Sequence, residues 1–95
     1  MTVRRVARFT VREDTRDRAE AAIREFVEHT RTESGTLRYE SIRFDATPNR
    51  FLHLMEFVDE EAERAHGSSE AVRRFTDALY PLCSEGPAFE DWSPV

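Results

Sequence analysis

Hydrophobic and polar residues recur along this chain with two different periods, and each change of period predicts a new element. In residues 3–12 the side chains alternate, with Ala7 and Phe9 on one face and Val6 and Arg8 on the other. An alternation of this kind is typical of a β-strand with two distinct faces.

A helix is expected next, because apolar positions recur three and four residues apart from Ala19 to Thr30. Asp14 or Thr15 can cap its N-terminus, and Gly35 can terminate it. The rest of the chain predicts strands at 36–44 and 50–58, helices at 60–66 and 70–82, and a last strand at 89–95.

The junctions between these later elements carry local signals. The loop 45–49 has the length of a hairpin connection, Asp59 and Ser69 are favourable N-caps, and Gly86-Pro87 is expected to break the chain before the last strand. The resulting order, β-α-β-β-α-β, is that of the ferredoxin-like α+β fold with an antiparallel sheet.

Both faces of the predicted sheet are apolar. In the third strand Phe51, Met55 and Phe57 lie on one face, while Leu52 and Leu54 lie on the other. The helices of one chain can cover only one face, so we expect a homodimer whose sheets pack face to face. The alternative is a hydrophobic edge hairpin, which would promote aggregation.

Length and composition limit the classes of protein that this chain can be. Residues 1–95 are enough for one domain and too few for a second core. The formal net charge of −5 argues against a nucleic-acid partner, and the single cysteine, Cys83, excludes an intrachain disulfide. No apolar leader begins the chain, and no segment approaches the roughly 18 apolar residues that span a bilayer. We expect a cytoplasmic protein with no nucleic-acid or membrane partner.

Two ionisable residues are candidates for proton transfer. Glu56 lies among leucines in the third strand: it either pairs with an arginine such as Arg38 or Arg43, or has a raised pKa and acts near a pocket. His66 ends the short helix 60–66, where it either stabilises the helix end or lies over a cavity and exchanges protons near neutral pH.

Three further residues carry polar groups on apolar or aromatic side chains. Tyr39 can orient a phenolic or carbonyl ligand through its hydroxyl. His53 lies on the strand face opposite Glu56, so the two cannot pair, and it is interpreted as a half-buried or interface histidine. Trp92 is expected in the core or in a pocket wall.

Motifs for nucleotide cofactors, serine nucleophiles and clustered metal sites are all missing from the sequence, so we expect no cofactor and no metal.

Several of these residues occur in an order and spacing that resembles the antibiotic biosynthesis monooxygenase domain. The resemblance covers nearly the whole chain. Its motifs are Gly35-x-Leu37-x-Tyr39, the run from Phe51 to Glu56, Asp59-x-Glu61-Ala62, His66-x-x-Ser69 and Phe75.

This resemblance implies a dimeric α+β barrel. Members of this family with known activity include oxygenases that turn polycyclic phenols into quinones without metal, flavin or haem, as well as quinol oxidases and isomerases. The family often has Trp at the position of Phe57. Haem-degrading relatives use an Asn on the first strand and a His on the last main helix, and this chain has neither.

By this resemblance we expect a cofactor-independent monooxygenase or quinol oxidase, with dioxygen as co-substrate and a small aromatic or enolic substrate between sheet and helices. His66 would transfer the proton, while Tyr39 and Glu56 would orient or stabilise the anion. The residues expected to contact the substrate are Phe9, His53, Phe57, Phe75 and Trp92. The alternatives are a non-catalytic small-molecule-binding or stress-associated dimer, and an isomerase on the same scaffold.

Overall fold

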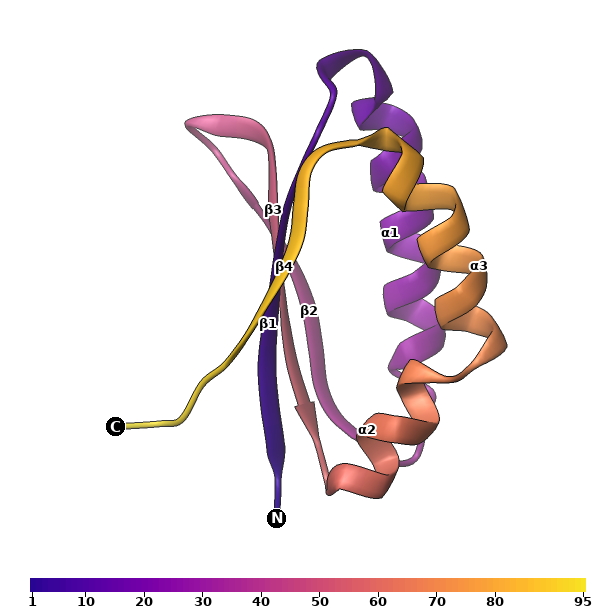
Figure 1. The fold of residues 1–95 in the computed structure, drawn as a ribbon, viewed down its shortest axis with the longest axis vertical. Helices are drawn as coiled ribbons and strands as arrows, with labels where there is room; N and C mark the ends of the chain where they lie inside the picture. Colours follow the sequence, from indigo (N-terminus) through magenta and orange to yellow (C-terminus); the bar gives the residue numbers. More distant parts are fainter.

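A four-stranded antiparallel sheet carries all of the helices on one face (Figure 1). The computed structural model describes residues 1–95. In chain order the elements are β1 (Val3–Val11), a 3₁₀ turn (Glu13–Thr15), α1 (Arg16–Thr30), β2 (Thr36–Phe44), β3 (Thr47–Phe57), α2 (Glu60–Gly67), α3 (Glu70–Leu79), a second 3₁₀ turn (Tyr80–Leu82) and β4 (Cys83–Asp91). The strand order β2-β3-β1-β4 confirms the predicted ferredoxin-like α+β fold.

The helix caps are confirmed at two of the three predicted sites. Asp59 accepts a hydrogen bond from the backbone N–H of Ala62 at 2.8 Å, and Ser69 accepts one from Val72 at 3.1 Å. The prediction of a side-chain cap on α1 is wrong, because the 3₁₀ turn enters the helix directly and Thr15 donates its hydroxyl to the Arg12 carbonyl instead.

The last strand begins earlier than predicted. β4 starts at Cys83 and continues through Gly86, which was expected to break the chain. Gly86 adopts a φ of +79°, and a Cβ there would lie 2.6 Å from the carbonyl oxygen of Arg8. Glycine tolerates this conformation, so the backbone of β4 can approach β1 closely. The strand therefore continues through Gly86, with a shift in its register against β1.

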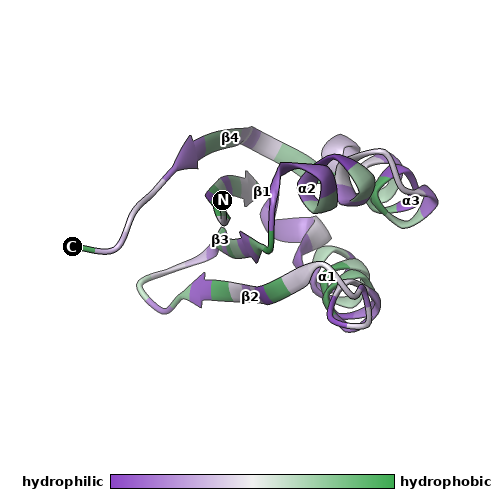
Figure 2. Cartoon of the chain, turned by 90° about the horizontal axis from the view of Figure 1, so that it is seen from below, coloured by the Kyte–Doolittle hydropathy of each residue, from purple (hydrophilic) through white to green (hydrophobic).

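The alternation in β1 and β3 separates two faces as predicted. Phe9, Phe51 and Phe57 face the helices and pack into one core with residues of α1 such as Ile23 and Phe26. Figure 2 shows the helices on one side of the sheet, with the opposite side uncovered. None of the helices is long and apolar enough to cross a membrane.

Gly35 allows α2 to approach the start of β2. A Cβ at this position would lie only 2.5 Å from the Cβ of Ala62, a contact that ordinary side chains do not make. The backbone carbonyl of Gly35 also accepts a hydrogen bond from Val58 at 2.9 Å, at the end of β3. The absence of a side chain at Gly35 therefore sets how closely α2 docks on the sheet edge.

Candidate functional site

A cavity of about 220 Å³ lies between the sheet and the helices α2 and α3. Eleven of its 18 lining residues are hydrophobic, which suits an apolar or aromatic ligand. Phe9, Phe57 and Phe75, which the sequence analysis predicted to contact the substrate, form part of its walls. The polar side chains around it come from different elements: Arg5 from β1, Tyr39 from β2, His53 from β3, and Glu63 and His66 from α2.

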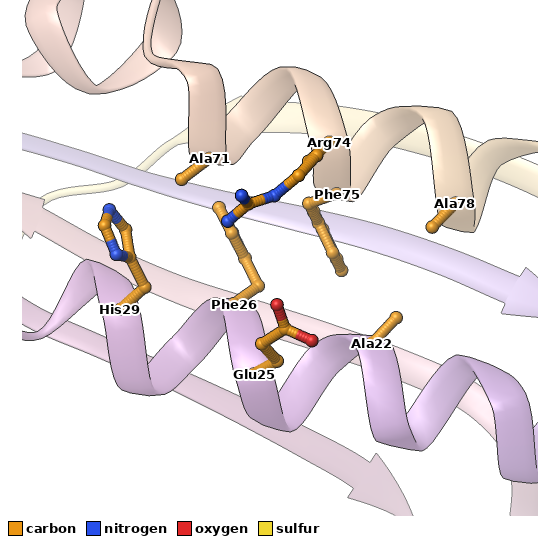
Figure 3. Close-up of a pocket in the computed structure, with 8 residues that line it drawn as sticks. All are labelled: Ala22, Glu25, Phe26, His29, Ala71, Arg74, Phe75 and Ala78. Carbon is orange, nitrogen blue, oxygen red and sulfur yellow. The ribbon is translucent and has the colours of Figure 1, made fainter.

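A second hollow lies on the outer surface between α1 and α3 (Figure 3). Ala22, Ala71 and Ala78 leave this groove open, and Phe26 and Phe75 line both the groove and the cavity. These two rings stack in parallel with centroids 4.1 Å apart, so they form the partition between the two spaces. No polar atom of the groove is both buried and unpaired, and the groove is therefore a weaker candidate than the cavity.

Tyr39 and His53 form a buried hydrogen-bonded pair on the helix-facing side of the sheet. The Tyr39 hydroxyl and Nδ1 of His53 are 2.9 Å apart, and the residues are 4% and 1% exposed. Burial lowers the pKa of His53 from 6.5 to about 4, so the imidazole is neutral at pH 7. Burial also raises the pKa of Tyr39, with smaller contributions from Tyr80 and Glu33.

The hydrogen-bond inventory of this pair determines the tautomer of His53. The Tyr39 hydroxyl has no acceptor other than Nδ1, so it is satisfied when Tyr39 donates and Nδ1 accepts. The proton of the neutral imidazole then resides on Nε2, and Nε2 is buried with no hydrogen-bond partner. A neutral donor without an acceptor is thus left on a residue that lines the cavity.

His66 pairs with Glu33, which the sequence analysis did not identify. Nδ1 of His66 lies 2.8 Å from Oε1 of Glu33, and the Thr36 hydroxyl donates to the same oxygen at 3.4 Å. The side chains of His66 and Glu33 are 10% and 24% exposed. Glu33 lies in the connection between α1 and β2, 33 residues before His66, and no local pattern connects the two.

Aromatic rings surround the His66 imidazole on its other sides. The ring centroids of Phe57, Phe26 and Tyr39 lie 4.9, 5.7 and 5.8 Å from it. His66 and Tyr39 are therefore neighbours in the cavity wall.

Glu56 and Trp92 lie on the other face of the sheet. Glu56 accepts a hydrogen bond from Nε of Arg4 at 3.0 Å, with Arg38 at 3.8 Å, so the interpretation as an arginine-paired carboxylate holds. The Trp92 indole donates to the Arg5 carbonyl at 3.1 Å and lies beneath the Arg4 guanidinium. Neither lines the cavity in which the substrate was expected: Glu56 is an even-numbered residue of β3, and these point away from the helices, while Trp92 follows the end of β4.

The interpretation of His53 as a half-buried or interface residue is also wrong. Its imidazole lies on the same face as Phe51 and Met55, packed edge-on against Phe9 at 5.1 Å and roughly parallel to Phe75 at 5.9 Å. The predicted opposition of His53 and Glu56 across the strand is confirmed, but the cavity lies on the His53 side. No three His, Cys, Asp or Glu side chains come together in an arrangement that could hold a metal ion.

The fold is shared with solved structures from several bacteria. A protein of Bacteroides thetaiotaomicron, provisionally named an antibiotic biosynthesis monooxygenase, superposes with a TM-score of 0.92 at 19% identity, over 99% of this chain and 90% of that one. A protein of Mycobacterium tuberculosis superposes with a TM-score of 0.91 at 20% identity, over 100% and 96% of the two chains. A protein of Shewanella oneidensis is 26% identical, with a TM-score of 0.86 over 96% of this chain and 88% of its own.

The sequence itself was also compared with curated proteins and with protein families. No curated protein matches the chain. The family model for antibiotic biosynthesis monooxygenases matches residues 2–78, which include Glu33, Tyr39, His53 and His66. This chain belongs to the antibiotic biosynthesis monooxygenase family.

Proposed function

We propose that this protein is a cofactor-independent oxygenase or quinol oxidase that acts on a small aromatic or enolic substrate. The observation that carries the proposal is the Glu33–His66 pair beside an apolar cavity, in a chain of the monooxygenase family. The cavity would hold the substrate ring, and His66 would remove the proton from its hydroxyl group.

The pairing with Glu33 equips His66 to act as a base. When the Glu33 carboxylate accepts a hydrogen bond from Nδ1–H, the lone pair of the imidazole is on Nε2, which has no protein partner. The same carboxylate stabilises the imidazolium that forms once Nε2 has taken up a proton. Glu33 is therefore the positioning residue for His66, and Glu56 has no role in this proposal.

Deprotonation makes the substrate electron-rich enough to reduce dioxygen directly. In an oxygenation, a phenol and one O₂ yield a quinone and one water, so one oxygen atom enters the product and the other leaves as water. In an oxidation, a quinol and one O₂ yield a quinone and hydrogen peroxide. The substrate supplies all the electrons in both reactions, and the protein contributes proton transfer, orientation and a site shielded from water.

We also propose that the protein acts as a homodimer through the uncovered sheet face. Val6, Leu52 and Leu54 lie on this face beside Ile42, which is 44% exposed. Charged side chains, among them Arg4 with Glu56 and Arg8 with Glu90, surround this apolar centre. Such a patch is typical of a protein interface, and proteins of this family are generally dimers.

The test is oxygen consumption with a panel of phenols and quinols, followed by the same assay on variants. His66→Ala should lower kcat at least about 100-fold, the usual contribution of a general base, while the protein keeps its circular dichroism spectrum. Glu33→Gln should lower kcat less, by about tenfold or more, because it misorients a base that is still present. His29→Ala, which changes a histidine outside the cavity, is the matched control.

Three outcomes distinguish the proposal from its alternatives. If His66→Ala turns over the substrate at the wild-type rate, His66 does not act as the base. Substrate conversion under anaerobic conditions would identify an isomerase. A rise in melting temperature with a ligand that never consumes oxygen would identify a binding protein.

A further inference from the structure

Two buried polar atoms without a hydrogen-bond partner belong to residues that line the cavity. They are Nε2 of His53 and Nε of Arg5. The third such atom in the protein, the Thr30 hydroxyl oxygen, belongs to a residue that does not line the cavity. Buried donors are rarely left unpaired in native proteins, so these two atoms indicate what a ligand must supply.

The charge of Arg5 is already compensated. Its Nε lies 3.3 Å from Oδ1 of Asp91 without the alignment of a hydrogen bond, and its guanidinium is 3.9 Å from Glu63. It also lies over the Phe89 ring at 5.1 Å. With two carboxylates beside one cation, this end of the cavity does not favour an anionic ligand.

His53 is the donor that requires a ligand. It is fully buried, its Nδ1 is held by Tyr39, and its ring is fixed between Phe9 and Phe75. An acceptor oxygen on a ligand would complete its hydrogen bonding, whereas a ligand without one would leave Nε2–H unpaired at a cost in affinity.

The volume of the cavity limits the size of the ligand. A cavity of about 150 Å³ holds one benzene ring, and pockets for drug-sized molecules begin at about 300 Å³. At about 220 Å³ this cavity has room for one ring or two fused rings. The stacked Phe26 and Phe75 side chains close one side of the cavity, so a third ring cannot extend in that direction without displacing them.

We propose that the cavity binds a neutral aromatic compound of one or two fused rings, whose carbonyl or phenol oxygen accepts a hydrogen bond from Nε2 of His53. This inference rests on the proposed function for the use of the site, and it narrows the small aromatic or enolic substrate of that proposal to neutral compounds of one or two rings. His53 is a specificity-determining residue here, distinct from the base His66.

The test is a binding series measured by isothermal titration calorimetry on the intact protein, with four probes. α-Tetralone has two fused rings and one carbonyl, and tetralin is its counterpart without oxygen. 9-Fluorenone adds a third ring, and 1-naphthoate adds a negative charge. In the wild-type protein α-tetralone should bind about tenfold more tightly than tetralin, since a net hydrogen bond is worth up to about tenfold in affinity. It should also bind more tightly than 9-fluorenone, which is too large, and 1-naphthoate, which is charged.

The variant His53→Phe separates the hydrogen bond from the fit of the rings. It should lower the preference for α-tetralone over tetralin about tenfold, while tetralin binding stays within a few fold of wild type. If His53→Phe does not fold, ¹⁵N NMR of the wild-type protein decides: the His53 Nε2 signal should shift with α-tetralone and not with tetralin.

Several results would overturn this inference. They are tetralin binding as tightly as α-tetralone in the wild type, 9-fluorenone or 1-naphthoate binding as tightly as α-tetralone, or an unchanged preference in His53→Phe. His66-dependent oxygen uptake together with any of these results would leave the proposed function intact. Conversely, the predicted binding order without oxygen uptake would refute the proposed function and retain the ligand class.

Discussion

Acidification should destabilise this protein through His53, because the folded state holds this imidazole neutral. Burial lowers the pKa of His53 from 6.5 to about 4, and no carboxylate is hydrogen-bonded to the ring to offset the loss of hydration. At a pH between these two pKa values, His53 is protonated in the unfolded chain and neutral in the folded chain. Stability therefore falls as the pH is lowered through this range.

The size of the effect follows from the two pKa values. Each unit of difference corresponds to about 1.4 kcal/mol, so His53 should cost about 2 kcal/mol by pH 5 and about 3 kcal/mol by pH 4, relative to pH 8. The free energy of unfolding of a typical domain is about 5–15 kcal/mol, so protonation of this single residue would remove a substantial part of it.

The assay is urea unfolding at pH 7, 6 and 5, at one ionic strength and one protein concentration, for wild type and His53→Phe. At pH 7 the variant should be less stable by about 1–3 kcal/mol, because Tyr39 loses its hydrogen-bond partner. Its stability should then fall less steeply with acid, so that the difference between the proteins shrinks by about 2 kcal/mol at pH 5. Contributions common to both proteins cancel in this comparison.

Parallel curves of stability against pH for the two proteins would refute the reasoning. An NMR titration of the His53 ring in the wild-type protein provides a second check. A midpoint near 6.5 would show that burial does not perturb this histidine, whereas a midpoint near 4 is expected.

Two further predictions concern packing. Gly35→Ala should lower the free energy of unfolding by about 1–3 kcal/mol, because its Cβ would overlap Ala62. The control Gly67→Ala should be neutral or slightly stabilising, because its Cβ would meet nothing closer than 3.8 Å. Equal effects of the two substitutions in chemical denaturation would contradict this account. Leu54→Arg on the uncovered face should reduce the mass measured by light scattering to the 11.1 kDa of one chain, while Ala21→Arg on the exposed side of α1 should leave a dimer. A dimeric Leu54→Arg protein would exclude this face as the interface.

Local signals were sufficient for most of the fold. The bounds of β2 were predicted correctly at 36–44, and the caps at Asp59 and Ser69 depend on residues within three positions of each other. The start of β4 could not be predicted in this way. Whether the strand ends at Gly86 or continues beside a neighbouring strand depends on β1, more than 70 residues earlier in the chain.

The candidate site was only partly predictable, because both faces of β3 are apolar. Alternation correctly places His53 and Glu56 on opposite faces, but it carries no information on which face the helices cover. In the absence of that information both Glu56 and His53 were assigned to the site although they lie on opposite faces, and only His53 lines the cavity. Glu33 was missed for a different reason: a carboxylate in a short connection between elements resembles any solvated residue until its distant partner is known.

Gly35 connects the packing of the fold to the geometry of the site. Glu33 lies two residues before Gly35, and His66 lies one helical turn after Ala62, the residue that Gly35 admits at close range. The approach that brings α2 onto the start of β2 is therefore the same approach that brings Nδ1 of His66 to 2.8 Å from Glu33. The adjacent strand β2 carries Tyr39, whose ring lies 5.4 Å from His53 and 5.8 Å from His66. One close contact at the sheet edge thus positions the proposed base beside the pair that we propose recognises the substrate oxygen.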